Sequence, residues 1–177
     1  MKLNNLIFTA LAGFSIILAG CQNNDENEQH YDNKLFISAS NFTKEILFKA
    51  GDTNVETGLS VAIAKPEEHD IKVTMSPAPE LLSTYKLAYY DETAVLLSEE
   101  HYSMPETSTT IKSGSIVSPE LPIEFINTGE LDIKTTYVLP VTIKSVEGIG
   151  VLQSAKTYYY VFRGASLINV VCNISRN

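Results

Sequence analysis

The feature that most constrains the fold is a period of two in the apolar residues between positions 34 and 164. Successive side chains of a β-strand point to opposite faces, so this period predicts strands with one buried face. Segments rich in Gly, Pro, Asn, Asp and Ser separate the strands. Short strands at this spacing predict an all-β, antiparallel sandwich over residues 34–164. The alternating series are Leu35 and Ile37; Leu59, Val61 and Ile63; Ile71, Val73 and Met75; Leu121, Ile123 and Phe125; Tyr137, Leu139, Val141 and Ile143; and Tyr158, Tyr160 and Phe162.

The alternation also predicts which side chains face the core. We expect Val61, Val73, Leu139 and Tyr160 to point inward. Pro140 lies within one of these series and has no N–H to donate to a neighbouring strand. Its strand is therefore predicted to lie at a sheet edge, or to carry a bulge at Pro140.

Three segments depart from the period of two. Residues 80–90 place apolar side chains at helical spacing after two prolines, which predicts a short helix across one end of the sandwich. Residues 93–108 show no period and are expected to form a loop. Gly148-Ile149-Gly150 lies between two strands, away from any helix start, and predicts a hairpin turn rather than a phosphate-binding loop.

The N-terminus carries the features of an export signal. Lys2 precedes an apolar run over residues 6–17, which is too short to span a bilayer. Ala19 and Gly20 are the small residues that a lipoprotein signal peptidase requires before a cysteine. We therefore expect residues 1–20 to be removed and Cys21 to carry lipid, the alternative being an ordinary secretory signal that contains a cysteine.

Residues 21–33 are predicted to be a flexible acidic tether, because residues 22–33 contain one aromatic and no aliphatic side chain. Asp25, Glu26 and Glu28 resemble the surface-export signal of Bacteroidetes lipoproteins. The expected location is the outer membrane, with the lipid-anchored domain facing the cell exterior.

Charge and cysteine content exclude several functions. Without residues 1–20 the chain carries 12 basic and 21 acidic side chains, a formal charge of −9 with no basic cluster. This balance argues against nucleic acid as a partner, so the membrane is expected to be reached through the lipid on Cys21. Cys172 is then the only free cysteine, which leaves no intramolecular disulfide and no thiolate metal site.

The ionisable residues do not predict a catalytic site. Glu99-Glu100-His101 is the densest group, but adjacent side chains of an extended chain point in opposite directions, which favours a solvated loop. His30 lies in the expected tether. His69, followed by Asp70, is interpreted as part of a polar hairpin turn, because no nearby residue completes a metal site. No catalytic residue, metal or cofactor is expected, and replacing His69, Glu99, Glu100 or His101 should change no activity of the parent protein.

Tyrosines are the best candidates for binding a ligand. Tyr158, Tyr159 and Tyr160 are consecutive, so Tyr159 should face outward if its neighbours pack inside. Tyr89, Tyr90 and Tyr102 are further candidates for exposed rings. Exposed aromatic faces beside polar groups are typical of carbohydrate binding, whereas the lack of Trp favours the alternative that these tyrosines line the core and rim.

Several segments together carry a resemblance to a known family over residues 34–164. They are Lys65-Pro66; Ile71–Met75 in full; Glu80-Leu81-Leu82 with Tyr85; Thr110-Ile111-Lys112-Ser113-Gly114 with Ser118; Leu131; Tyr137-Val138-Leu139-Pro140-Val141; and Thr157-Tyr158-Tyr159-Tyr160. The chain resembles the immunoglobulin-like N-terminal domain of unknown function found in many Bacteroidetes surface lipoproteins. In that family the domain precedes endoglycosidase-like, laminin-G-like or discoidin-like modules.

The resemblance implies an immunoglobulin-like sandwich that serves as a spacer or glycan-binding accessory in a surface protein of polysaccharide utilisation. It implies a glycan or a glycan-transport complex as partner, and no catalytic residues to carry over. The alternative is a structural or adhesive subunit related to fimbrial lipoproteins. The chain departs from the family pattern because it lacks a complete downstream module.

Residues 165–177 are expected to be a linker or the first strand of a second domain. Leu167, Ile168, Val170, Val171 and Ile174 make this segment apolar, which is unusual for a C-terminal tail. A second interpretation is that it pairs with the sandwich as an additional edge strand.

Overall fold

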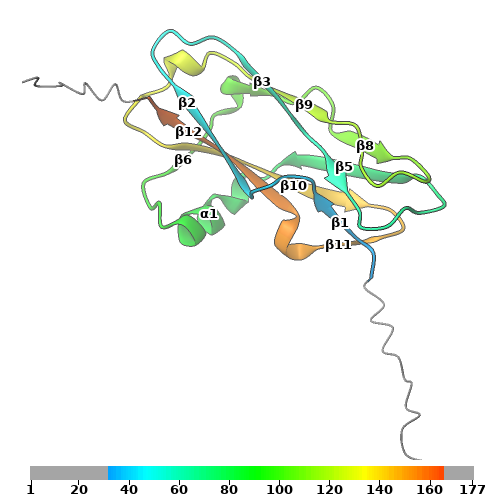
Figure 1. Cartoon of the computed structure of the whole chain (residues 1–177). Helices are drawn as coiled ribbons and strands as arrows, with labels where there is room; N and C mark the ends of the chain where they lie inside the picture. Colours follow the sequence, from blue (N-terminus) through cyan, green and yellow to red (C-terminus); the bar gives the residue numbers. More distant parts are fainter. Residues whose placement is uncertain (1–31, 166–177) are drawn as a thin grey trace, which may run out of the picture. The chain divides into compact units, whose positions relative to one another are not determined.

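A computed structural model describes residues 32–165, and these residues form a β-sandwich with one short α-helix (Figure 1). The fold class predicted from the sequence is therefore confirmed. The predictions for residues 1–31 and 166–177, including the signal peptide, Cys21 and the apolar segment after residue 165, lie outside the described residues. Within the described part, no helix is long and apolar enough to cross a membrane.

A six-stranded sheet forms one layer of the sandwich. Its strand order is β2-β12-β10-β5-β8, with β6 paired to β10. Neighbouring strands from β12 to β8 are antiparallel, whereas β2 runs parallel to β12 and β6 runs parallel to β10. The strands are β2 (Thr43–Phe48), β12 (Thr157–Gly164), β10 (Tyr137–Val146), β5 (Ile71–Pro77), β8 (Ser108–Ile111) and β6 (Val95–Leu96).

Two three-stranded sheets complete the sandwich. One has the order β3-β9-β7, and the other has the order β11-β1-β4, in which β1 and β11 are parallel. Side chains from all three sheets share one hydrophobic core. The strands are β3 (Val55–Leu59), β9 (Leu121–Phe125), β7 (Tyr102–Ser103), β11 (Gly150–Val151), β1 (Lys34–Ile37) and β4 (Val61–Ala62).

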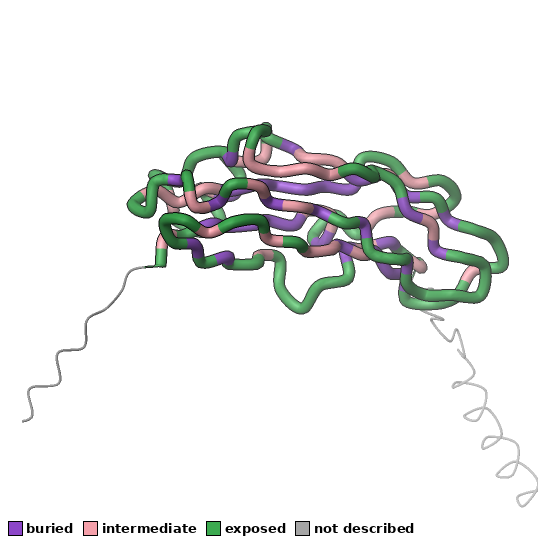
Figure 2. Tube along the Cα trace, turned by 90° about the horizontal axis from the view of Figure 1, so that it is seen from above, coloured by how far each residue is buried: buried purple, intermediate pink, exposed green. Residues whose placement is uncertain are grey.

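The inner core confirms the predicted inward faces. Val61, Val73, Leu139 and Tyr160 are each at most 2% exposed. Figure 2 shows the buried stretches along the strands and the exposed stretches mainly in the connections. We use the term inner core for the larger cluster of buried side chains, which includes these four residues together with Phe48, Phe125 and Phe162.

Pro140 does not lie on an edge strand, so that prediction is wrong. Strand β10 is paired on both sides, and its register shift lies between Ile143 and Ser145 rather than at Pro140. The Pro140 carbonyl accepts a hydrogen bond from the Ala78 amide at 2.9 Å, just beyond the end of β5. On that side of β10, the pairing with β6 ends at Val138 and the pairing with β5 begins at Val141. Pro140 therefore occupies the gap between two partners, where a missing N–H costs no ladder hydrogen bond.

One predicted strand is divided between two sheets. Leu59 ends β3 and pairs with β9, whereas Val61 begins β4 and pairs with β1. Ser60 lies between the two strands, and its carbonyl accepts a hydrogen bond from the Ser38 amide at 2.9 Å. The alternation continues through Ser60, since both sheets bury the same face of the chain against one core.

The helix is present where it was predicted in the chain, but it covers the outer face of the six-stranded sheet instead of crossing one end of the sandwich. A 3₁₀ turn (η1, Pro79–Leu81) leads into α1 (Leu82–Tyr89), which ends where Tyr90 adopts a left-handed conformation. The prediction of a plain loop over residues 93–108 is wrong, because β6, a 3₁₀ turn (η2, Glu99–His101) and β7 lie in it. These strands have only two residues each, too few to show a period.

The strand β2 was not predicted, since its alternation is short: only Ile46 and Phe48 are buried in it. Gly148 does make a turn, with φ of +81°, but the strand that follows pairs with β1 instead of returning along β10. The chain then returns antiparallel to β10 as β12, so the predicted hairpin is present with a longer connection than expected. Two other 3₁₀ turns, η3 (Thr128–Glu130) and η4 (Gln153–Ala155), lie in the connections before β10 and β12.

Candidate functional site

A second, smaller apolar cluster lies on the outer face of the six-stranded sheet, under α1. Strand β12 supplies Tyr159 and Val161 to this face, while Tyr160 and Phe162 point into the inner core. Val138 of β10 and Tyr85 of α1 pack against them. We name this group, together with Ala94, the outer cluster. It attaches the helix to the sheet and determines how the tyrosines at the end of the helix are presented.

Three tyrosine rings pack together at the edge of the outer cluster. Tyr85 and Tyr89, one helical turn apart, stack with ring centroids 4.9 Å apart and an interplanar angle of 29°. The Tyr159 ring lies 5.4 Å from that of Tyr85 and 6.0 Å from that of Tyr89. Tyr159 is only 7% exposed, so the prediction that it presents its ring to solvent is wrong. Its side chain does point to the outer face, but α1 covers it.

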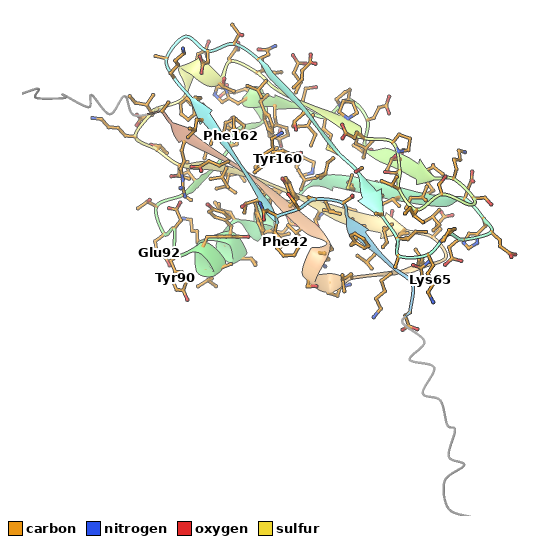
Figure 3. The ribbon with its side chains drawn as sticks, in the orientation of Figure 1. Phe42, Lys65, Tyr90, Glu92, Tyr160 and Phe162 are labelled. Atoms are coloured by element: carbon orange, nitrogen blue, oxygen red, sulfur yellow. The ribbon has the colours of Figure 1, made fainter. Side chains whose placement is uncertain are left out.

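The exposed rings are those of the residues that end the helix. Tyr89 is 41% exposed and Tyr90 is 93% exposed, which confirms them as exposed tyrosines, whereas Tyr102 is partly buried. Figure 3 shows Tyr90 and Glu92 beside the end of α1. Tyr90 has φ of +55°, a conformation that costs a residue with a Cβ about 1–2 kcal/mol and that glycine usually occupies after a helix.

A charged group lies beside these rings. Arg163, next on the outer face of β12 after Val161, places one guanidinium nitrogen 3.4 Å from Glu45 and the other 3.6 Å from Asp91. The Asp91 side chain is 15% exposed, whereas those of Arg163 and Glu45 are about half exposed. Burial and the Asp91 carboxylate raise the pKa of Tyr85, and Arg163 partly offsets this effect. Arg163 therefore lies close to both the Tyr85 hydroxyl and the segment after the helix.

Arg163 was not among the residues singled out in the sequence. The signal that identifies it is the alternation itself, which places Tyr159, Val161 and Arg163 on one face of β12. Its partner Asp91 comes from a segment far away in the chain, and no sequence pattern connects the two.

The group Glu99-Glu100-His101 does not form a catalytic arrangement. Both glutamates are exposed on η2, and the His101 Nε2 atom lies 3.8 Å from Glu100. The other ring nitrogen, Nδ1, is 3.1 Å from the Ile126 carbonyl, which holds the imidazole against the neighbouring loop. The predicted solvated segment is thus a 3₁₀ turn with exposed carboxylates and a histidine used for packing.

The residues around His69 form a polar connection as predicted, but it is not a hairpin, because the flanking strands β4 and β5 belong to different sheets. Asp70 accepts hydrogen bonds from Lys112 Nζ at 2.8 Å and from the Ser113 amide at 2.9 Å, and these bonds lower the pKa of Asp70. The carboxylate next to His69 is therefore already paired with a lysine. Across residues 32–165, no three His, Cys, Asp or Glu side chains are grouped so that they could hold a metal ion.

Comparison with known proteins places this fold among N-terminal domains. A family model described as a "-like, N-terminal domain" matches residues 31–150. A search of curated proteins finds no match.

Solved structures from Bacteroides share the fold at low sequence identity. A candidate carbohydrate binding protein from Bacteroides ovatus aligns with a TM-score of 0.65 and 18% identity, over 73% of this chain and 36% of that protein. EndoBT-3987 of Bacteroides thetaiotamicron, solved with a Man5GlcNAc product, aligns with a TM-score of 0.61 and 19% identity, over 73% of this chain and 30% of that enzyme. A multidomain protein including DUF1735 from Bacteroides ovatus aligns with a TM-score of 0.52 and 21% identity, over 72% of this chain and 42% of that protein. The chain thus spans less than half the length of these relatives.

Proposed function

Since the chain belongs to the family of N-terminal domains whose model matches residues 31–150, we propose that it is a non-catalytic accessory module of a cell-surface protein involved in polysaccharide utilisation. The observation that carries the proposal is that this sandwich aligns with 36% of a candidate carbohydrate binding protein and with 30% of EndoBT-3987, which was solved with a Man5GlcNAc product. A domain that accompanies different glycan-related chains is best understood as an accessory to them.

The geometry of the described residues supports an accessory role over a catalytic one. General acid–base catalysis requires titratable groups held within hydrogen-bond distance of one substrate. Here Asp70 is paired with Lys112, Glu80 with Lys144 at 3.0 Å, and Glu45 with Arg163. These carboxylates lie at separate positions on the surface. Hydrogen bonds from Lys112 and Lys144 lower the pKa of Asp70 and Glu80, which disfavours these two groups as proton donors.

We expect the module to be held at the outer membrane by lipid on Cys21, facing the cell exterior. The experiment is metabolic labelling with palmitate: wild-type protein should take up label and Cys21→Ala should not. Label retained by Cys21→Ala would contradict the anchor. Proteinase added to intact cells should degrade the domain, and full protection would contradict its exposure on the cell surface.

The role in glycan use is tested by deleting the gene in the bacterium that encodes it. Growth on a panel of polysaccharides as sole carbon source should be lost or slowed for at least one of them and unchanged on glucose. Restoring the chain with Glu99→Gln or His101→Gln should rescue growth as well as the wild type. Normal growth of the deletion strain on every polysaccharide would contradict the proposal, and filaments of the purified protein would favour an adhesive subunit instead.

A further inference from the structure

Tyr89 is a ring that is both exposed and held in place. Stacking on Tyr85 and the edge contact with Tyr159 fix its orientation, yet 41% of the residue remains exposed. Tyr85 is itself only 2% exposed, so the stack rests on a buried base. A ring that is already ordered loses little conformational freedom when a ligand packs on it.

Tyr90 is exposed at a conformational cost that packing does not offset. The left-handed backbone is normally left to glycine, and a ring that is 93% exposed contributes almost no burial to the fold. The left-handed turn directs the chain from α1 toward Asp91, whose amide bonds back to the Lys86 carbonyl at 3.3 Å. The residue is therefore better explained by a role on the surface than by a role in stability.

Arg163 supplies polar groups beside Asp91, the residue that follows Tyr90. A guanidinium has five N–H donors, and Arg163 directs one nitrogen to Glu45 and one to Asp91 while its side chain remains 48% exposed. Asp91 also accepts a hydrogen bond from the Thr93 hydroxyl at 3.2 Å, which holds the carboxylate in position. Donors and acceptors with fixed positions thus lie directly after Tyr90 in the chain.

We infer that Tyr89, Tyr90 and Arg163 form a binding surface for neutral carbohydrate, and this inference rests on the proposed function. The C–H faces of a sugar ring pack against aromatic rings, while its hydroxyl groups bond to guanidinium and carboxylate groups at the side. Glu45 and Asp91 both pair with Arg163, and the chain as a whole has a formal charge of −8, so an anionic glycan is disfavoured.

The test is affinity electrophoresis of the full chain in native gels that contain yeast mannan, starch, xylan or galactan, with polygalacturonate as the anionic probe. At least one neutral polysaccharide should retard the wild type. Tyr90→Gly should weaken that retardation about tenfold or more, the loss expected for one aromatic contact. This variant removes the ring and relieves the left-handed backbone, so it should fold at least as well as the wild type. Tyr89→Ala and Arg163→Gln should also weaken binding.

Two variants serve as controls. Tyr90→Phe keeps the ring and should bind within about twofold of the wild type. Ile116→Ala removes a side chain that is 49% exposed on the loop bonded to Ile63, and it should bind as the wild type does.

Wild-type retardation that survives Tyr90→Gly would overturn the inferred surface, as would retardation by polygalacturonate alone. A wild type that no neutral polysaccharide retards would also overturn it. The growth test of the deletion strain decides the proposed function separately, so the two failures are distinguishable.

Discussion

The inner core and the outer cluster are built on the two faces of one sheet, and they differ in how they are closed. Adjacent residues of the same strands supply both: Leu139 and Tyr160 point to the inner core, while Val138 and Tyr159 point to the outer cluster. Three sheets enclose the inner core, whereas one helix of eight residues covers the outer cluster. The aromatic rings of the inner core are therefore buried, whereas exposed tyrosines border the outer cluster.

The two clusters therefore have different roles within a small domain: the inner core stabilises the fold, and the outer cluster supports the inferred binding surface. Side chains enclosed by several sheets contribute most of the apolar burial that stabilises the fold. A cluster under one short helix is easier to open locally, because fewer contacts hold it. Its partly exposed rings are nevertheless ordered by those beneath them, which is the arrangement that a binding surface requires.

The largest effect should come from the inner core. Leu139→Ala should lower the free energy of unfolding by about 2–5 kcal/mol, because it leaves a cavity among enclosed side chains. Urea denaturation measures this change, with Leu47→Ala as the matched control, since Leu47 is 64% exposed on β2. The control should change stability by less than about 0.5 kcal/mol. Equal losses for the two leucines would contradict the assignment of inner and outer faces.

A smaller and more local effect is expected in the outer cluster. Tyr85→Ala should cost about 1.5–3 kcal/mol, the range for burying one large side chain. Hydrogen exchange should show amides of α1 losing protection while those of β10 and β12 keep theirs. Leu87→Ala, at a residue of the same helix that is 74% exposed, serves as the control. Protection lost equally across both strands would show that the helix and the sheet open as one unit.

Alkaline pH should destabilise the inner core through Tyr160. The Tyr160 hydroxyl is buried with no hydrogen-bond partner among residues 32–165, and burial raises the pKa of Tyr160. As the pH rises, Tyr160 therefore ionises in the unfolded chain before it does so in the folded protein. Its contribution to folding stability is complete below about pH 10 and falls as the pH rises toward the pKa of Tyr160 in the folded protein.

Tyr160→Phe should reduce this alkaline loss, measured by thermal unfolding from pH 8 to pH 11. At pH 7 the variant should be as stable as the wild type or more stable, because it removes an unbonded buried hydroxyl. Tyr90→Phe, at an exposed ring, should leave the pH dependence unchanged. A destabilising Tyr160→Phe at pH 7 would indicate that the hydroxyl does make a bond.

The smallest effect should come from surface charges that belong to neither cluster. Hydrogen bonds from Lys112 and Ser113 lower the pKa of Asp70. Their contribution to folding stability is therefore present above the pKa of Asp70 in the unfolded chain, and it is lost as the pH falls through the pKa of Asp70 in the folded protein. Because the pair is exposed, Asp70→Asn should leave the melting temperature at pH 7 almost unchanged. A large drop would mean that this turn is coupled to the inner core.

Much of the fold was predictable because its signal is local. The period of two located most of the long strands and their inward faces, and helical spacing after two prolines located α1. The missed strands are short or weakly patterned: β2 has two buried residues, β8 has four residues, and β6, β7 and β11 have two residues each. The exposure of Tyr89 and Tyr90 was also predictable, since both lie where the helical pattern ends.

The sequence by itself determined the class of fold, the strand faces and the helix, because alternation and helical spacing are properties of neighbouring residues. Only the tertiary structure decided which elements lie side by side. It placed Pro140 in the gap between β6 and β5, divided one apolar series between β3 and β4, covered Tyr159 with α1, and brought Asp91 to Arg163. These outcomes depend on contacts between residues far apart in the chain, which a local pattern does not encode.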